Sequence, residues 1–167
     1  VVLVDENEMT AVMMGFPTLK GLSRETPSTY VSVLLNQNAA LHYIDVAQEF
    51  GLAGDVCPMP EAELGVSIDD DAPILGACAV QCNTTCDGSL MSNGGIAKRL
   101  ELEDGIPIFQ LAAPLRHRED DVQDYAAQEI RNCIAFIEEK TGEKWDWKYY
   151  FECAKRVNES TRPVSYT

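Results

Sequence analysis

Short, continuously apolar runs alternate along this chain with longer segments whose apolar residues recur at helical spacing. The runs Val1–Val4 and Ile74–Val80 predict strands that are buried on both faces of a sheet. A third strand is predicted over Ile106–Leu111, with a proline near its start, where a sheet tolerates one. The segment from Phe16 to Arg24 has no such pattern, and we expect it to be a loop.

The segments between the strands predict helices. The clearest has one apolar face, ends before Gly142 as a C-terminal cap, and is followed by Asp146 as the N-cap of a last helix. The stripe of that last helix, which contains Trp147 and Phe151, is expected to be buried. The predicted helices span Glu8–Met14, Pro27–Phe50, Glu61–Ile68, Ser89–Leu100, Glu119–Lys140 and the residues after Asp146. This alternation predicts an α/β fold, a small Rossmann-like parallel sheet flanked by helices.

The charge and the apolar content exclude two kinds of partner. The net charge of −14 opposes general electrostatic binding to nucleic acid. The chain contains no run of eighteen apolar residues, so we expect no membrane-spanning helix. Because the first residues also lack a basic segment and a cleavage site for secretion, we expect a cytoplasmic protein. The opening resembles the middle of a fold, which suggests a piece of a longer protein.

Three of the six cysteines, Cys78, Cys82 and Cys86, cluster where the second strand meets a helix. In a reducing compartment, clustered cysteines indicate metal binding or catalysis more often than disulfides. Cys78 is predicted to be buried in the strand, while Cys82 and Cys86 are expected in the following loop and Cys57 in another loop. Since ligands of open α/β sheets bind at the carboxyl ends of strands, these loop thiols are candidates for one site. The spacing matches neither a zinc ribbon nor a ferredoxin.

The remaining residues indicate less chemistry. Cys133 and Cys153 are expected on the core faces of helices, as small apolar residues. The sequence contains no phosphate-binding glycine loop and no nucleophile elbow. Nothing in the spacing pairs His42 with a loop cysteine as a hydrolase would require.

Several segments resemble the 2-hydroxyacyl-CoA dehydratase / benzoyl-CoA reductase family. Gly51–Gly65 resembles the first cysteine segment of that family, and Asn83–Gly88 resembles the second. Ile106–Phe109 and Phe136–Gly142 resemble the stretch that follows. The resemblance extends from about Glu8 to Asn158.

The resemblance implies an iron–sulfur subunit of a lyase. Carried over by position, Cys57 and Cys86 would be the metal ligands of a [4Fe-4S] cluster, with Cys82 as an additional cofactor-binding thiol. Glu25 loosely matches an acidic residue near the family's substrate, which makes it the candidate acid–base residue. The implied reaction is radical dehydration of a 2-hydroxyacyl-CoA through a ketyl, after an ATP-dependent iron–sulfur activator has supplied one electron.

The resemblance also implies a larger assembly. Family subunits pair with a homologous second subunit as heterodimers, and each has a second α/β subdomain that supplies a third cysteine ligand. Residues 1–167 are therefore expected to be the N-terminal, cluster-binding subdomain. Two alternatives stay open: a subunit of a benzoyl-CoA reductase-like or double-cluster reductase, and a non-catalytic partner subunit that only carries a cluster.

Overall fold

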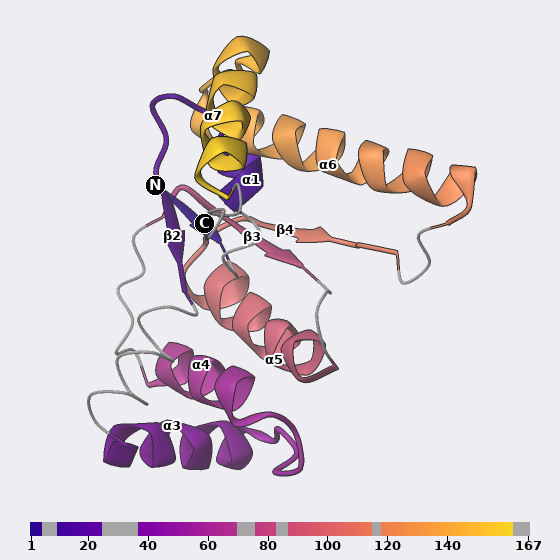
Figure 1. The fold of residues 1–167 in the computed structure, drawn as a ribbon. Coiled ribbons are helices and arrows are strands. Elements are labelled where there is room, and N and C mark those ends of the chain that lie inside the picture. The colour runs from indigo at the N-terminus through magenta and orange to yellow at the C-terminus, as the bar shows by residue number, and fades with distance from the viewer. Residues whose placement is uncertain (5–9, 25–36, 70–75, 83–86, 115–117, 162–167) are drawn as a thin grey trace, which may run out of the picture.

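A parallel sheet of four strands forms the centre of the protein (Figure 1). The computed structural model describes residues 1–4, 10–24, 37–69, 76–82, 87–114 and 118–161. The strands lie in the order β2-β1-β3-β4. Their bounds are Val2–Val4 for β1, Gly21–Ser23 for β2, Cys78–Cys82 for β3 and Ile108–Leu111 for β4. The expected α/β class with a small parallel sheet is confirmed.

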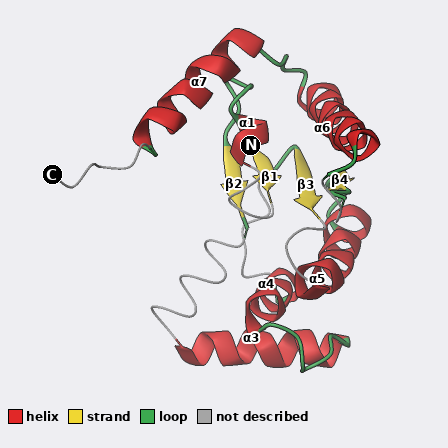
Figure 2. Ribbon diagram, turned by 45° about the vertical axis from the view of Figure 1, so that its right-hand side comes forward, coloured by secondary structure: helices red, strands yellow, loops and turns green. Residues whose placement is uncertain are grey.

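Helices cover both faces of this sheet (Figure 2). One face packs against α1 and α6. The core on the other face contains residues of α5, of α4, which packs on α5, and of α3, which packs on α4. After α5 the chain continues in a wider π-helical segment, Lys98–Glu103. The bounds of the helices are Thr10–Met13 for α1, Gln37–Phe50 for α3, Pro58–Ile68 for α4, Asp87–Ala97 for α5, Asp120–Thr141 for α6 and Trp147–Ser160 for α7.

The two faces have separate cores because successive strand residues point to opposite sides. Cys78 and Val80 of β3 pack toward α1 and α6, and Ala79 packs toward α3, α4 and α5. The helix that follows β1 therefore lies on one face and the helix that follows β3 on the other. In doubly wound sheets, ligands bind at the carboxyl ends of two such neighbouring strands.

Two strand predictions need correction. The segment Phe16–Arg24 was expected to be a loop but contains β2, a short edge strand. Glycine and serine begin and end this strand, and neither is typical of strands. Next to it, Val2 N–H donates a hydrogen bond to Lys20 O at 2.9 Å. The strand predicted over Ile74–Val80 begins at Cys78 and continues to Cys82. Cys82 is therefore a strand residue rather than a loop residue.

The expected burial of the last helix is also wrong. Helix α7 has no buried residue, and Trp147 and Phe151 are 57% and 64% exposed. The aromatic stripe starts in the core, where Trp145 meets Phe16 edge-on with a centroid separation of 5.3 Å. It continues onto the surface through Tyr150, whose ring lies 5.3 Å from that of Trp145. The helical spacing of the apolar residues predicted which side chains share a face of α7. Whether another element covers that face depends on tertiary packing.

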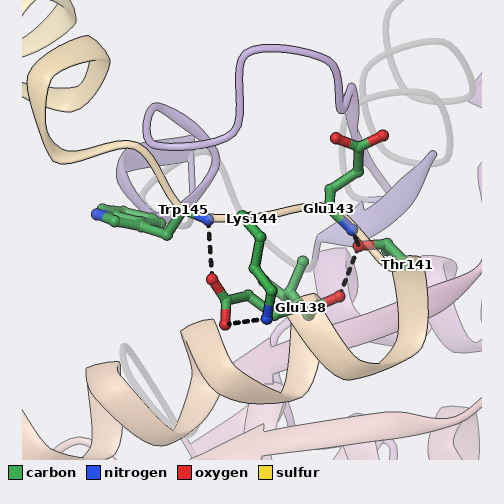
Figure 3. Close-up of polar contacts among 6 residues, drawn as sticks. Glu138, Thr141, Glu143, Lys144 and Trp145 are labelled. Atoms are coloured by element: carbon green, nitrogen blue, oxygen red, sulfur yellow. Dashed lines mark hydrogen bonds and ion pairs between the residues drawn. The ribbon is translucent and has the colours of Figure 1, made fainter.

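Polar contacts of Glu138 hold the turn between α6 and α7 (Figure 3). Gly142 has a left-handed φ of 76°, and its N–H donates to Glu138 O at 2.9 Å. The Glu138 carboxylate accepts from Trp145 N–H at 2.9 Å and from Lys144 Nζ at 3.1 Å. These two donors hold the pKa of Glu138 below its ordinary value. Asp146 caps α7 by accepting from the N–H groups of its first turn, as expected.

Candidate functional site

Helix α4 lies at the carboxyl ends of the strands, whose arrowheads in Figure 2 point toward it. Every residue of Pro60–Val66 is buried, so this part of α4 is covered on all sides. On one side, a Cβ added to Gly65 would collide with the backbone carbonyl of Tyr43 in α3. On another side, Leu64 contacts Gly95 of α5. Helix α4 thus closes the end of the sheet at which a ligand site is expected.

Five buried polar side chains lie among the described residues of α4, β3 and α5. They are Glu61 and Glu63 of α4, Gln81 of β3, and Ser92 and Asn93 of α5, and we call them the polar layer. A buried polar group is costly unless it is hydrogen-bonded, so proteins seldom concentrate such groups without a functional reason. The polar layer is therefore the candidate site in the described part of the chain.

An ion pair joins α4 to the end of β2. Arg24, the residue after β2, places Nη2 3.3 Å from Oε1 of Glu63. The two side chains are only 10% and 8% exposed. Because both charges are largely buried, this close pair ties α4 to the end of β2.

Side-chain amides make two further contacts at the polar layer. Asn93 Nδ2 donates to the carbonyl oxygen of Cys82 at 3.0 Å, which ties α5 to the last residue of β3. Gln48 of α3 donates from Nε2 to Oε1 of Glu61 at 3.3 Å. The first contact joins a helix to a strand, and the second joins two helices.

Gln81 differs from the other members of the polar layer. Its side chain is fully buried, and neither its Oε1 nor its Nε2 has a hydrogen-bond partner in the structure as described. It lies two residues after Ala79, so it shares the face of β3 that packs toward α4 and α5. A complete amide without partners is rare in a protein interior and requires an explanation.

The predicted site residues fall in different environments. Cys57 is an exposed free thiol in the N-cap position directly before α4. Cys82 is 6% exposed and packs in the core on the side of α6. Cys57 is therefore open to solvent, whereas Cys82 is enclosed in a core. Cys86 and Glu25 lie outside the described residues.

The remaining cysteines are less accessible than Cys57. Burial raises the pKa of Cys78 to about 11 and that of Cys133 to about 12. Both are fully buried core residues, as predicted. Cys153, expected in a core, is instead only half-buried on α7.

Two absences concern the described residues alone. Within them, no three side chains of histidine, cysteine, aspartate or glutamate are grouped so that they could hold a metal ion. No helix in these ranges is long and apolar enough to cross a membrane.

Sequence reasoning missed the polar layer. A weak signal existed, because Gln81 interrupts an otherwise apolar strand and Glu63 interrupts a helix of mostly small and apolar residues. Arg24 carried no signal, because the strand before it was not predicted. Isolated polar residues in short elements are common on surfaces, so only the packing distinguishes these.

Comparison with known proteins agrees with the sequence resemblance. Residues 9–164 match the family described as "2-hydroxyglutaryl-CoA dehydratase, D-component". The chain is also 25% identical over 152 residues to the (R)-phenyllactyl-CoA dehydratase alpha subunit of Clostridium sporogenes. That alignment covers 87% of this chain and 36% of the relative, so the chain spans about a third of the relative's length. With most of its residues matched, the chain belongs to the 2-hydroxyglutaryl-CoA dehydratase D-component family.

Proposed function

We propose that this chain is the cluster-binding part of an iron–sulfur subunit of a 2-hydroxyacyl-CoA dehydratase. The enzyme would be a lyase that removes water from a 2-hydroxyacyl-CoA. Membership of the family supports the reaction class. The structural observation that carries the proposal is the exposed thiol of Cys57 at the start of α4, the helix that closes the carboxyl ends of the strands.

Cys57 and Cys86 would hold a [4Fe-4S] cluster. Cys57 fits as a ligand because it is exposed and free, and because a soft cysteine sulfur suits an iron–sulfur cluster. Cys86 directly precedes the first residue of α5 in the sequence. Cys82 is the weaker third candidate, because its side chain belongs to the core. Such a cluster supplies single electrons for radical dehydration.

The chain's own residues would bind and orient the substrate. The Arg24–Glu63 pair fixes α4 over the carboxyl ends, and this excludes water from the polar layer. Glu25 follows Arg24 in the sequence and is our candidate acid–base residue. A buried polar environment strengthens every hydrogen bond that a substrate makes there.

The proposal includes partners. The relative from Clostridium sporogenes is named as an alpha subunit, which supports an enzyme of several subunits. We propose a homologous second subunit as the heterodimer partner and an ATP-dependent iron–sulfur activator as the electron source, both in the cytoplasm.

The test is anaerobic purification of the full polypeptide that carries this chain, followed by iron and sulfide analysis and EPR. We expect stoichiometric iron in the wild type and a loss of at least half of it in Cys57→Ser and Cys86→Ser. Cys153→Ser, which changes a half-buried cysteine far along the chain on α7, is the control and should retain its iron.

Three results would contradict the proposal. A wild-type protein that stays free of iron after reconstitution would exclude the cluster. Full iron in Cys57→Ser would exclude the ligand assignment. Reduction of an aromatic acyl-CoA without dehydration of a 2-hydroxyacyl-CoA would assign the chain to the reductases instead.

A further inference from the structure

We propose that the buried amide of Gln81 binds the 2-hydroxyl group and the thioester carbonyl of the acyl-CoA. The inference rests on the proposed function and adds a residue that discriminates hydroxylated from unhydroxylated thioesters. It is based on the burial of this side chain, its unused hydrogen-bonding groups and its place in the sheet.

The hydrogen-bonding capacity of Gln81 is unused in the described structure. Its side chain is 0% exposed, and both Oε1 and Nε2 lack a partner. The neighbouring strand offers a direct comparison, since Gln110 pairs in register with Gln81 but is exposed to solvent. An apolar residue would fill the position of Gln81 without loss of hydrogen bonds to water. The amide therefore lowers the stability of the ligand-free protein, as groups reserved for a ligand commonly do.

The position of Gln81 suits the reacting end of a ligand. The residue is next to the last residue of β3, one of the two strands between which the connection order reverses. Its side chain faces the layer of α4 and α5, where the other buried polar groups lie. Two opposite charges at this end of the sheet, Arg24 and Glu63, are paired with each other at 3.3 Å. A neutral polar group is thus a better occupant than an ion.

The hydrogen-bonding groups of a 2-hydroxyacyl thioester complement those of a primary amide. Its carbonyl oxygen can accept from Nε2, and its hydroxyl, on the adjacent carbon, can donate to Oε1. One amide can therefore make both hydrogen bonds at once. A thioester without the hydroxyl leaves Oε1 buried and unpaired, and a site built for a hydroxyl rejects such an analogue strongly.

The experiment compares Gln81→Met with the matched control Gln110→Met in the full-length protein. Dissociation constants are measured by calorimetry for 2-hydroxyglutaryl-CoA and glutaryl-CoA, and for (R)-phenyllactyl-CoA and 3-phenylpropionyl-CoA. We expect the wild type and Gln110→Met to prefer the hydroxylated member of one pair by about tenfold or more. Gln81→Met should lose this preference, and its melting temperature without ligand should rise by a few degrees.

The outcomes separate this inference from the proposed function. Wild-type protein that binds neither hydroxylated thioester overturns both. A Gln81→Met protein that melts higher but keeps the wild-type preference overturns the inference alone, since the amide then serves only an enclosed water or nothing. If Gln81→Met does not fold, Gln81→Asn withdraws the amide by one methylene, and an unchanged preference in that variant also overturns the inference.

Discussion

The contact between α3 and α4 gives a sharp prediction about stability. Gly65 of α4 faces the backbone of Tyr43 in α3, and a Cβ at that position would collide with the carbonyl group. A backbone group cannot swing aside as a flexible side chain can, so Gly65→Ala must push the two helices apart. Gly94 of α5 is the matched control, because it is also a helical glycine but has open space around its Cβ position.

The magnitude follows from two opposing effects. Alanine stabilises a helix by about 1 kcal/mol relative to glycine at either position. Overpacking a buried contact costs about 1–3 kcal/mol, and we take about 3 kcal/mol because the collision at Gly65 is with backbone atoms. Gly65→Ala should therefore lower the free energy of unfolding by about 2 kcal/mol, while Gly94→Ala should raise it by about 1 kcal/mol.

Thermal unfolding followed by circular dichroism measures both effects. For a protein of this size, each kcal/mol changes the melting temperature by about 2–4 °C, so Gly65→Ala should fall by about 4–8 °C and Gly94→Ala should rise by about 2–4 °C. Equal melting temperatures for the two variants would show that α3 and α4 do not cross as closely as the structure places them. In that case α4 would not close the carboxyl end of the sheet as described above.

Two further predictions use the titrating groups. Iodoacetamide at pH 8 should label the exposed Cys57 within minutes. Cys78 and Cys133, with pKa values of about 11 and about 12, should react only after denaturation. Peptide mass spectrometry measures the labelling of each cysteine, and rapid labelling of Cys133 in the native protein would contradict the prediction. The folded-state pKa of Glu138 is held below its ordinary value, so its contribution to stability is present above about pH 4.5 and is lost as the pH falls through the folded pKa. Glu138→Gln should therefore lose less stability than the wild type in urea titrations below that pH, and parallel curves would refute the assignment.

Local features of the fold were predicted from local sequence. Gly142 and Asp146 cap their helices as expected, because a left-handed residue and a side chain that accepts from N–H groups are requirements of the adjacent backbone alone. The short apolar run at the N-terminus formed a strand as predicted, because a continuous apolar run is typical of a strand that is covered on both faces. The α/β class followed from the alternation of such elements, and the family resemblance followed from the order of the cysteine segments.

Tertiary structure decided which side chains meet. The strand β2 exists because β1 lies beside it, and Arg24 pairs with Glu63 only once α4 lies across the sheet. Cys82 became a core residue because β3 continues to it and α6 covers that face. Trp147 remains exposed because no described element packs on it.

The sequence by itself thus determined the elements, their caps, the thiols available for chemistry and the family. The packing alone showed that Cys57 is exposed at the start of α4 while Cys82 lies in the core, and that the amide of Gln81 is enclosed without a hydrogen-bond partner in the described structure. The physical reason is that capping and periodicity depend on neighbours within one turn or strand, whereas burial and pairing depend on residues that the chain brings together from distant segments.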